Sequence, residues 1–89
     1  DVDETNEKVI SETEFVFSSR LEIDYLNDKY ELEIPVSEEY ETLGGFIIQH
    51  HEEIPQAGEE IEILDFRFTI LEASDKLIEE VKLELLNHS

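Results

Sequence analysis

Apolar residues recur in two rhythms along this 89-residue chain, and the rhythms predict its helices and strands. In residues 61–70, apolar side chains alternate with polar ones, as is typical of strands with one buried face. In residues 21–30 and 43–51 they recur at intervals of three and four, which predicts two amphipathic helices. Residues 15–17 are aromatic and β-branched and predict a further, short strand.

Two prolines punctuate this pattern. Pro35 ends the first helical unit because it lacks an amide donor and disfavours helical angles at Ile34. Three glutamates within residues 38–41 place negative charge ahead of the second helix, where a helix N-terminus favours it. That helix is expected to end at about His51, before Pro55.

The last apolar segment fits two elements. Leu77, Ile78, Val81 and Leu85 follow Ser74 at the spacing of a capped helix. The apolar residues 81, 83 and 85 also alternate with the charged residues 82 and 84, which is the pattern of a strand. The pattern by itself favours the helix.

The N-terminal segment looks different from the rest. Residues 1–14 hold six acids and three apolar side chains without a sustained period, which predicts an acidic linker or tail. The folded domain is therefore expected to span residues 15–86, with residues 87–89 as a C-terminal tail. The longest apolar stretch, residues 43–48, is shorter than the roughly 20 residues of a membrane span or the roughly seven of a signal peptide core. We expect neither direct membrane insertion nor an export signal.

Charge and composition narrow the possible functions. Six Lys and Arg against 25 Asp and Glu give a formal charge of −19, which argues against nucleic acid or anionic lipid as a partner. The absence of Cys excludes disulfides, thiolate metal sites and a Cys nucleophile. An apolar fraction of 39% is still enough for a folded single domain.

Two groups of residues could bind a metal ion. Asp1, Asp3, Thr5 and Glu12 match the ligand spacing of a calcium loop, but Asn6 replaces its glycine and no helix precedes it, so a plain linker is expected.

The second group surrounds His50 and Glu53, an i,i+3 pair if the helix persists. His50 and His51 would point about 100° apart, and spacing identifies no third ligand. We expect His50 to pack partly beside Phe46 and His51 to be solvated, which leaves His50 and Glu53 as weak metal candidates.

Gly44 and Gly45 lack the rest of a phosphate-binding motif and are expected to permit close helix packing. No nucleophile motif occurs, and with 25 acids a carboxylate pair carries no information. We therefore assign no catalytic residue and no cofactor-binding residue.

Residues 42–48, followed by Ile54–Pro55 and Gly58–Glu59, resemble the T-L-G-G-hydrophobic run, I-P and G-E turn of the transporter-associated domain, or CorC/HlyC domain. This family occurs in CorC-like and hemolysin-like membrane proteins that contain CBS domains. The resemblance extends over residues 15–83, and the positions that carry it outside the core run are Leu21, Asp24, Leu26, Asn27, Pro35, residues 68–73, Ile78 and Val81. Ser18–Ser19 precedes Arg20 where the family often has Asp-Gly.

The resemblance implies an α+β fold of order β-α-α-β-β-β, a small, mostly antiparallel sheet covered by two helices, similar to part of a flavin adenine dinucleotide (FAD)-binding, PCMH-like fold. It makes the last segment a strand, against the pattern's preference for a helix. A turn at Ser74–Asp75 would let this strand pair with residues 66–73.

The resemblance also implies a function. It predicts a non-enzymatic regulatory module on the cytoplasmic side of the membrane, beside the transmembrane and CBS domains of a parent protein, that modulates magnesium and cobalt efflux. Residues 1–14 would then be the linker from the CBS pair. The alternatives are a small-ligand module related to FAD binding and a weak divalent-cation sensor. An exposed strand edge would also allow a homodimer.

Overall fold

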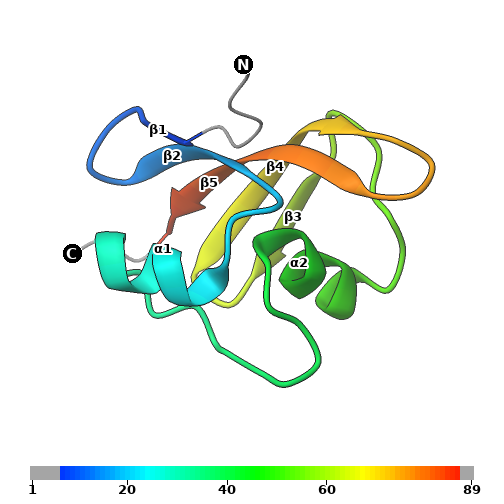
Figure 1. Ribbon diagram of the computed structural model, residues 1–89. Coiled ribbons are helices and arrows are strands. Elements are labelled where there is room, and N and C mark those ends of the chain that lie inside the picture. Colours follow the sequence, from blue (N-terminus) through cyan, green and yellow to red (C-terminus); the bar gives the residue numbers. More distant parts are fainter. Residues whose placement is uncertain (1–6, 87–89) are drawn as a thin grey trace, which may run out of the picture.

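The structure, a computed structural model, describes residues 7–86 and shows one antiparallel sheet with two helices (Figure 1). The order across the sheet is β1-β2-β5-β4-β3, and each pair of neighbours is antiparallel. This confirms the expected α+β class and adds one strand at the N-terminal side. The strands are β1 (Glu7–Val9), β2 (Glu14–Ser18), β3 (Glu60–Ile63), β4 (Phe66–Ala73) and β5 (Ile78–Leu85).

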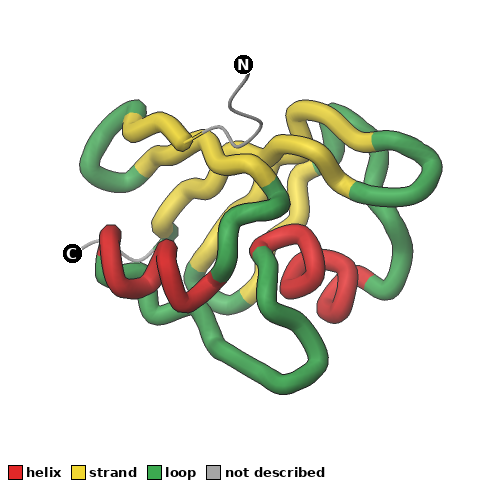
Figure 2. Tube along the Cα trace, in the orientation of Figure 1, coloured by secondary structure: helices red, strands yellow, loops and turns green. Residues whose placement is uncertain are grey.

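Both helices, α1 (Ile23–Tyr30) and α2 (Leu43–His51), lie on the same side of the sheet (Figure 2). The second helix has the predicted bounds. The first begins two residues later than the pattern indicated because Glu22 pairs with Thr42 in an isolated bridge and stays extended. The acidic residues 38–41 precede α2 without joining it, and Thr42 instead caps it by accepting the N–H of Gly45 at 3.3 Å.

The core lies between the sheet and the helices. Three fully buried phenylalanines from β2, α2 and β4 form its centre, Phe17, Phe46 and Phe68, and the rings of Phe46 and Phe68 lie 5.9 Å apart. Alternate residues of the strands supply most of the remainder, as the period of two predicts. The strand residues that are buried in this core are Phe15, Phe17, Ile61, Ile63, Phe66, Phe68, Ile70, Ile78, Val81 and Leu83.

The ambiguous last segment is the strand β5, as the resemblance implied and the pattern did not. Its pairing with β4 is irregular, because the register shifts between Ile70 and Glu72 and again between Glu72 and Ala73. The irregularity lets Ile78 and Val81 both face the core although three positions separate them. That spacing imitates a helix. The turn at Ser74 has the expected place, and the Ser74 N–H donates to the carbonyl of Leu77 at 2.8 Å.

The start of the folded unit differs from the sequence-based expectation. Residues 1–14 were expected to form a linker, yet the part of this segment that the structure describes forms β1 and the turn into β2. The strand was missed because neither Lys8 nor Val9 is buried, so it leaves no hydrophobic period. Residues 1–6 and the expected tail at 87–89 lie outside the described residues.

Replacing Phe17 with Ala should lower the free energy of unfolding by about 3–5 kcal/mol, because the whole ring lies in the core. Val16→Ala, at the half-buried neighbour on the opposite face, should cost less than about 1 kcal/mol. Urea unfolding followed by circular dichroism measures both. Equal losses would contradict the assigned face of β2.

Candidate functional site

The two glycines of the T-L-G-G run are explained by packing. A Cβ on Gly44 would lie 2.9 Å from the Cβ of Ser19, and one on Gly45 would lie 3.0 Å from that of Tyr40. The Gly44 N–H donates to the carbonyl of Ser19 at 3.0 Å. The glycines therefore allow the start of α2 to approach the turn after β2, in agreement with the close-packing interpretation.

The histidine group does not assemble as a metal site would. Helix α2 ends at His51 and Glu52 adopts a left-handed conformation with φ 73°, so the helix that would pair His50 with Glu53 does not persist. The Nδ1 of His50 lies 3.0 Å from the carbonyl oxygen of Phe46, and the imidazole and phenyl ring centroids lie 4.6 Å apart with the ring planes tilted by 54°. His51 is half-buried rather than solvated, with Nε2 3.8 Å from a carboxylate oxygen of Glu59.

The residues with calcium-loop spacing do not form one continuous loop. Glu7–Val9 is a strand and Glu12 is an exposed residue of the following turn, while Asp1, Asp3 and Thr5 lie outside the described residues. Within residues 7–86, no three His, Asp or Glu side chains converge as metal ligands would.

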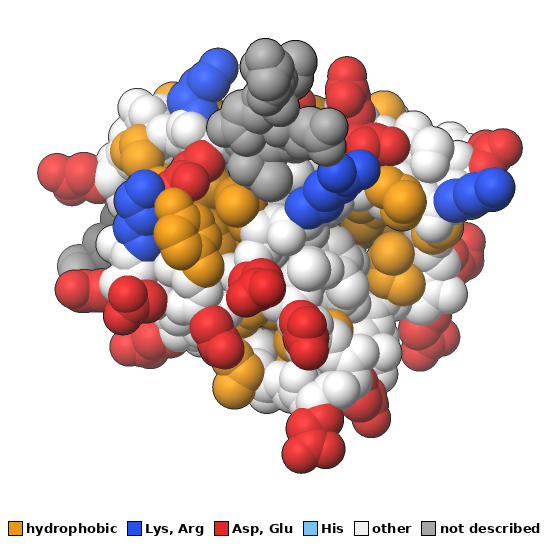
Figure 3. Space-filling view, in the orientation of Figure 1, with side chains coloured by type: hydrophobic (Ala, Val, Ile, Leu, Met, Phe, Trp, Pro, Cys, Tyr) orange, Lys and Arg blue, Asp and Glu red, His pale blue; other side chains and the backbone are white. Residues whose placement is uncertain are grey.

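Acidic side chains gather in the lower part of Figure 3, over α1 and the loop that follows it. A hollow of about 390 Å³ on this side is lined by four carboxylates, together with Val36, Ser37 and Tyr40. The carboxylates belong to Glu22, Asp24, Glu38 and Glu41, and we call this the acidic hollow.

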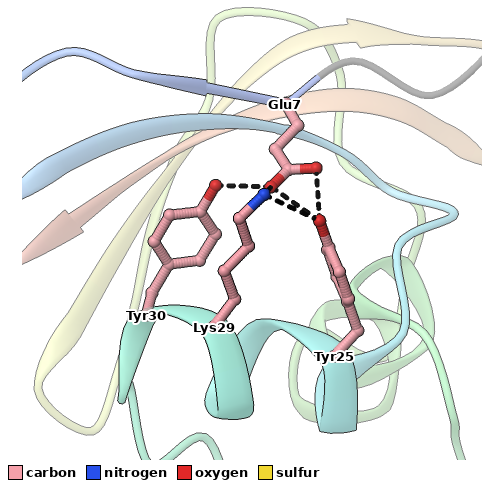
Figure 4. A network of polar contacts seen from close by, with 4 residues as sticks. All are labelled: Glu7, Tyr25, Lys29 and Tyr30. Carbon is pink, nitrogen blue, oxygen red and sulfur yellow. Dashed lines mark hydrogen bonds and ion pairs between the residues drawn. The ribbon is translucent and has the colours of Figure 1, made fainter.

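The tightest polar cluster joins β1 to α1, and we call it the clasp: Glu7, Tyr25, Lys29 and Tyr30. The Glu7 carboxylate points from β1 toward three donors that rise from α1 (Figure 4). It accepts the Tyr25 hydroxyl at 2.7 Å, the Lys29 ammonium at 2.7 Å and the Tyr30 hydroxyl at 2.5 Å. Lys29 also donates to the Tyr25 oxygen at 3.1 Å.

These contacts change the proton affinities of the clasp. Hydrogen bonds from Lys29, Tyr30 and Tyr25 lower the pKa of Glu7 from 4.5 to about 2, against a smaller opposing effect of burial. The same Glu7 hydrogen bond raises the pKa of Lys29. Burial first, and then Glu7, raises the pKa of Tyr30 to about 12. The Glu7 carboxylate is thus charged at neutral pH, and Lys29 and Tyr30 keep their protons.

The clasp is fixed to the core through Tyr30. Its ring lies 5.1 Å from that of Phe15 and 5.3 Å from that of Phe17. Lys29 lies over the rings of Tyr25 and Tyr30 at 5.5 and 5.6 Å. Sequence analysis missed this cluster, because its acid and its donors are about 20 positions apart and are brought together only by the pairing of β1 with β2.

Comparison with known families decides where this fold belongs. Residues 8–87 match the family described as the transporter associated domain, CorC_HlyC. The chain belongs to this family. The transporter-associated domain is the one that the T-L-G-G run and the I-P and G-E turn indicated.

Three relatives place the transporter-associated domain in context. Hemolysin C of Brachyspira hyodysenteriae is 30% identical over 87 residues, which cover 94% of this chain and only 32% of that protein. A structure from Neisseria meningitidis MC58, described as a region associated with the Mg²⁺ and Co²⁺ transporter CorC, has a TM-score of 0.79 and 26% identity and covers 90% of this chain and 98% of its own.

The third relative is the CorC_HlyC domain of a Xylella fastidiosa Temecula1 hemolysin, whose structure is a complex with Mg²⁺ and Mn²⁺. It has a TM-score of 0.72 and 23% identity and covers 91% of this chain and 98% of its own. Among the residues described here, no helix has the length and apolarity needed to cross a membrane.

Replacing Glu7 with Gln should lower the free energy of unfolding by about 1–2 kcal/mol at pH 7, because charge-assisted hydrogen bonds become neutral ones. The folded-state pKa is lowered, so this contribution is complete above about pH 5 and is lost as the pH falls toward 2. The difference between the two proteins should therefore shrink over that range. Urea unfolding at a series of pH values measures it.

Glu12→Gln is the matched control, because Glu12 is an exposed acid of the same hairpin. It removes one negative charge and should leave stability within about 0.5 kcal/mol of the original. A Glu7→Gln effect that is no larger than the control, or that persists unchanged at pH 2, would contradict the assigned strength of the clasp.

Proposed function

We propose that this transporter-associated domain is a non-enzymatic regulatory and interaction module of a larger CorC-like or hemolysin-like membrane protein. It acts on the cytoplasmic side, beside the transmembrane and CBS domains, and modulates divalent-cation transport, with magnesium and cobalt as the expected ions. The match to the family over nearly the whole chain supports this role, as does the fact that the chain spans only 32% of Hemolysin C.

The observation that carries the proposal is the clasp. In a parent protein, the preceding domains would connect to this one through β1. Three side chains of α1 donate hydrogen bonds to Glu7 and so hold β1 to that helix. A displacement of the preceding domains would therefore act on α1 through one carboxylate. The donors are directed at Glu7 and so are engaged within the fold rather than with a substrate.

The surface gives less support to the FAD alternative. A dinucleotide pyrophosphate needs positive charge or converging N–H groups. The acidic hollow instead presents four carboxylates, and only six Lys and Arg stand against 25 acids in the chain. A relation to an FAD-binding fold therefore stays a prediction.

The regulatory role is tested in the parent protein, with transport measured as magnesium and cobalt efflux from loaded cells at a series of cytoplasmic concentrations. Deleting residues 7–86 should abolish the dependence of efflux on the cytoplasmic concentration, while membrane insertion remains intact. Glu7→Gln should shift that dependence in the same direction, because it weakens the tie between β1 and α1. Glu12→Gln serves as the control and should behave as the unmodified protein.

Regulated efflux that is unchanged by the deletion would overturn the proposal. Efflux is divided by the amount of each variant in the membrane, so that transport per molecule is compared even where a variant reaches the membrane in a smaller amount.

A second candidate is a weak divalent-cation sensor that attracts the ion through the summed charge of the four carboxylates of the acidic hollow, since these do not converge as metal ligands would. Hard divalent cations relieve the repulsion among carboxylates. The Xylella relative, which is a complex with Mg²⁺ and Mn²⁺, is consistent with this role.

Magnesium at about 10 mM should raise the melting temperature by about 5 °C over sodium chloride of equal ionic strength, if the hollow binds the ion with a dissociation constant of about 1 mM. The rise should disappear in the variant Asp24→Asn/Glu41→Gln, which removes two carboxylates of the hollow. It should persist in Glu72→Gln/Glu79→Gln, which removes two exposed acids elsewhere. An identical rise in all three proteins would show general screening and no sensor.

A further inference from the structure

We propose that the outer edge of β2 and the three donors of the clasp form a binding site for an extended acidic segment of a partner protein, and that β1 occupies this site in cis. The proposal deepens the proposed interaction role and rests on it for the existence of a partner. It gives the partner a chemistry: a β-strand that carries a carboxylate.

The donors already form a carboxylate receptor. Two hydroxyls and one ammonium converge on Glu7, and both carboxylate oxygens are engaged, since the Tyr25 hydroxyl lies 2.7 Å from Oε1 and 2.8 Å from Oε2. The side chain of Glu7 is only 22% exposed, which is low for a glutamate on an outer strand. The hydrogen bonds to both oxygens fix the position of the carboxylate, and the Lys29 ammonium favours its negative charge.

The receptor does not depend on β1 for its shape. β2 pairs with β5 over five residues, and Tyr30 packs on Phe15 and Phe17. Helix α1 is anchored by Ile23 and Leu26, both buried. A strand could thus leave the site while the donors remain in place.

β1 itself is attached by little else. It pairs with β2 at three positions only, and none of its side chains belongs to the hydrophobic core. Lys8 is exposed and Val9 is 55% exposed. The site therefore recognises one side chain of the strand, the Glu7 carboxylate. Backbone hydrogen bonds to β2 supply the remaining contacts, as in strand addition to a sheet edge.

Charge favours this edge over the other outer strand for an acidic segment. At β2, Lys29 stands beside the incoming carboxylate. At β3, Glu60 projects from the strand as an exposed side chain and would repel it, and the nearby Arg67 is already paired with Glu62 at 3.2 Å. An open hollow of about 400 Å³ adjoins the clasp at Tyr25 and leaves room for longer side chains of a partner.

The test uses the full 89-residue chain with Glu7→Gln and, as the probe, a synthetic peptide of residues 5–11 with blocked ends. Glu7 is the only acid in this peptide. Titration followed by amide NMR should show saturable shifts in β2 and α1. A peptide with Gln in place of Glu should bind about tenfold more weakly, because it loses the charge-assisted hydrogen bonds. The unmodified chain should bind the Glu peptide more weakly than the variant, because its own β1 competes.

Three results would overturn the proposal: no saturable binding, equal binding of the Glu and Gln peptides, or shifts confined to regions away from β2 and α1. If Glu7→Gln fails to fold, hydrogen exchange of the unmodified chain replaces it. Excess Glu peptide must then speed exchange at the amides of Lys8 and Ile10, which face β2 in the antiparallel register, without changing β4 and β5, and unaltered exchange would refute the site.

A carboxylate-dependent dimer of the unmodified chain would support the receptor and identify a second copy as the source of the strand. These measurements are independent of transport, so a failed peptide titration leaves the efflux experiment to decide the regulatory role. Loss of regulation on deletion, together with no peptide binding, would retain the proposed function and remove this site.

Discussion

The buried residue Ser19 joins the three parts of the fold at one point. Its N–H donates to the carbonyl of Glu79 at 3.0 Å, its hydroxyl donates to the carbonyl of Ile78, and its own carbonyl accepts the N–H of Gly44. The end of β2, the start of β5 and the start of α2 therefore meet there. Only a residue without a Cβ permits this approach, because a Cβ at position 44 would lie 2.9 Å from that of Ser19. The placement of α2 over the sheet, and of the loop that leads into it, depends on this contact.

A helix or strand could be predicted from the sequence where the spacing of its own apolar residues matches its type. α2 and β4 were predicted because their apolar residues face the core at the regular spacing of a helix and a strand. β5 was ambiguous because the register shifts opposite Glu72 place core residues three positions apart. β1 and the clasp could not be predicted, because one carboxylate holds the strand and its partners lie on another element. The site is thus a tertiary property, whereas the helices are local ones.

The distribution of charge follows from the same architecture. The face of the sheet opposite the helices carries Arg67, which lies 3.2 Å from Glu62 and 3.5 Å from Glu84, and Lys82, which lies 3.9 Å from Glu14. Basic side chains are thus paired with acids on neighbouring strands, where cross-strand pairs contribute a few tenths of a kcal/mol to about 1 kcal/mol. The side with α1 and its following loop keeps an acidic excess, and self-repulsion there is relieved by screening ions.

A connected set of contacts links the two features on which the functional proposals rest. Glu7 reaches α1 through Lys29 and its two tyrosines. On the same helix, the Asn27 side chain binds both the N–H and the carbonyl of Ile34 at 2.8 Å. Ile34 lies in the loop that continues to Glu38 and Glu41 of the acidic hollow. The far end of this loop is also held to α1, because the Glu41 carbonyl accepts the Ile23 N–H at 2.9 Å. The strand at the edge of the sheet and the loop that carries Glu38 and Glu41 are therefore both attached to α1.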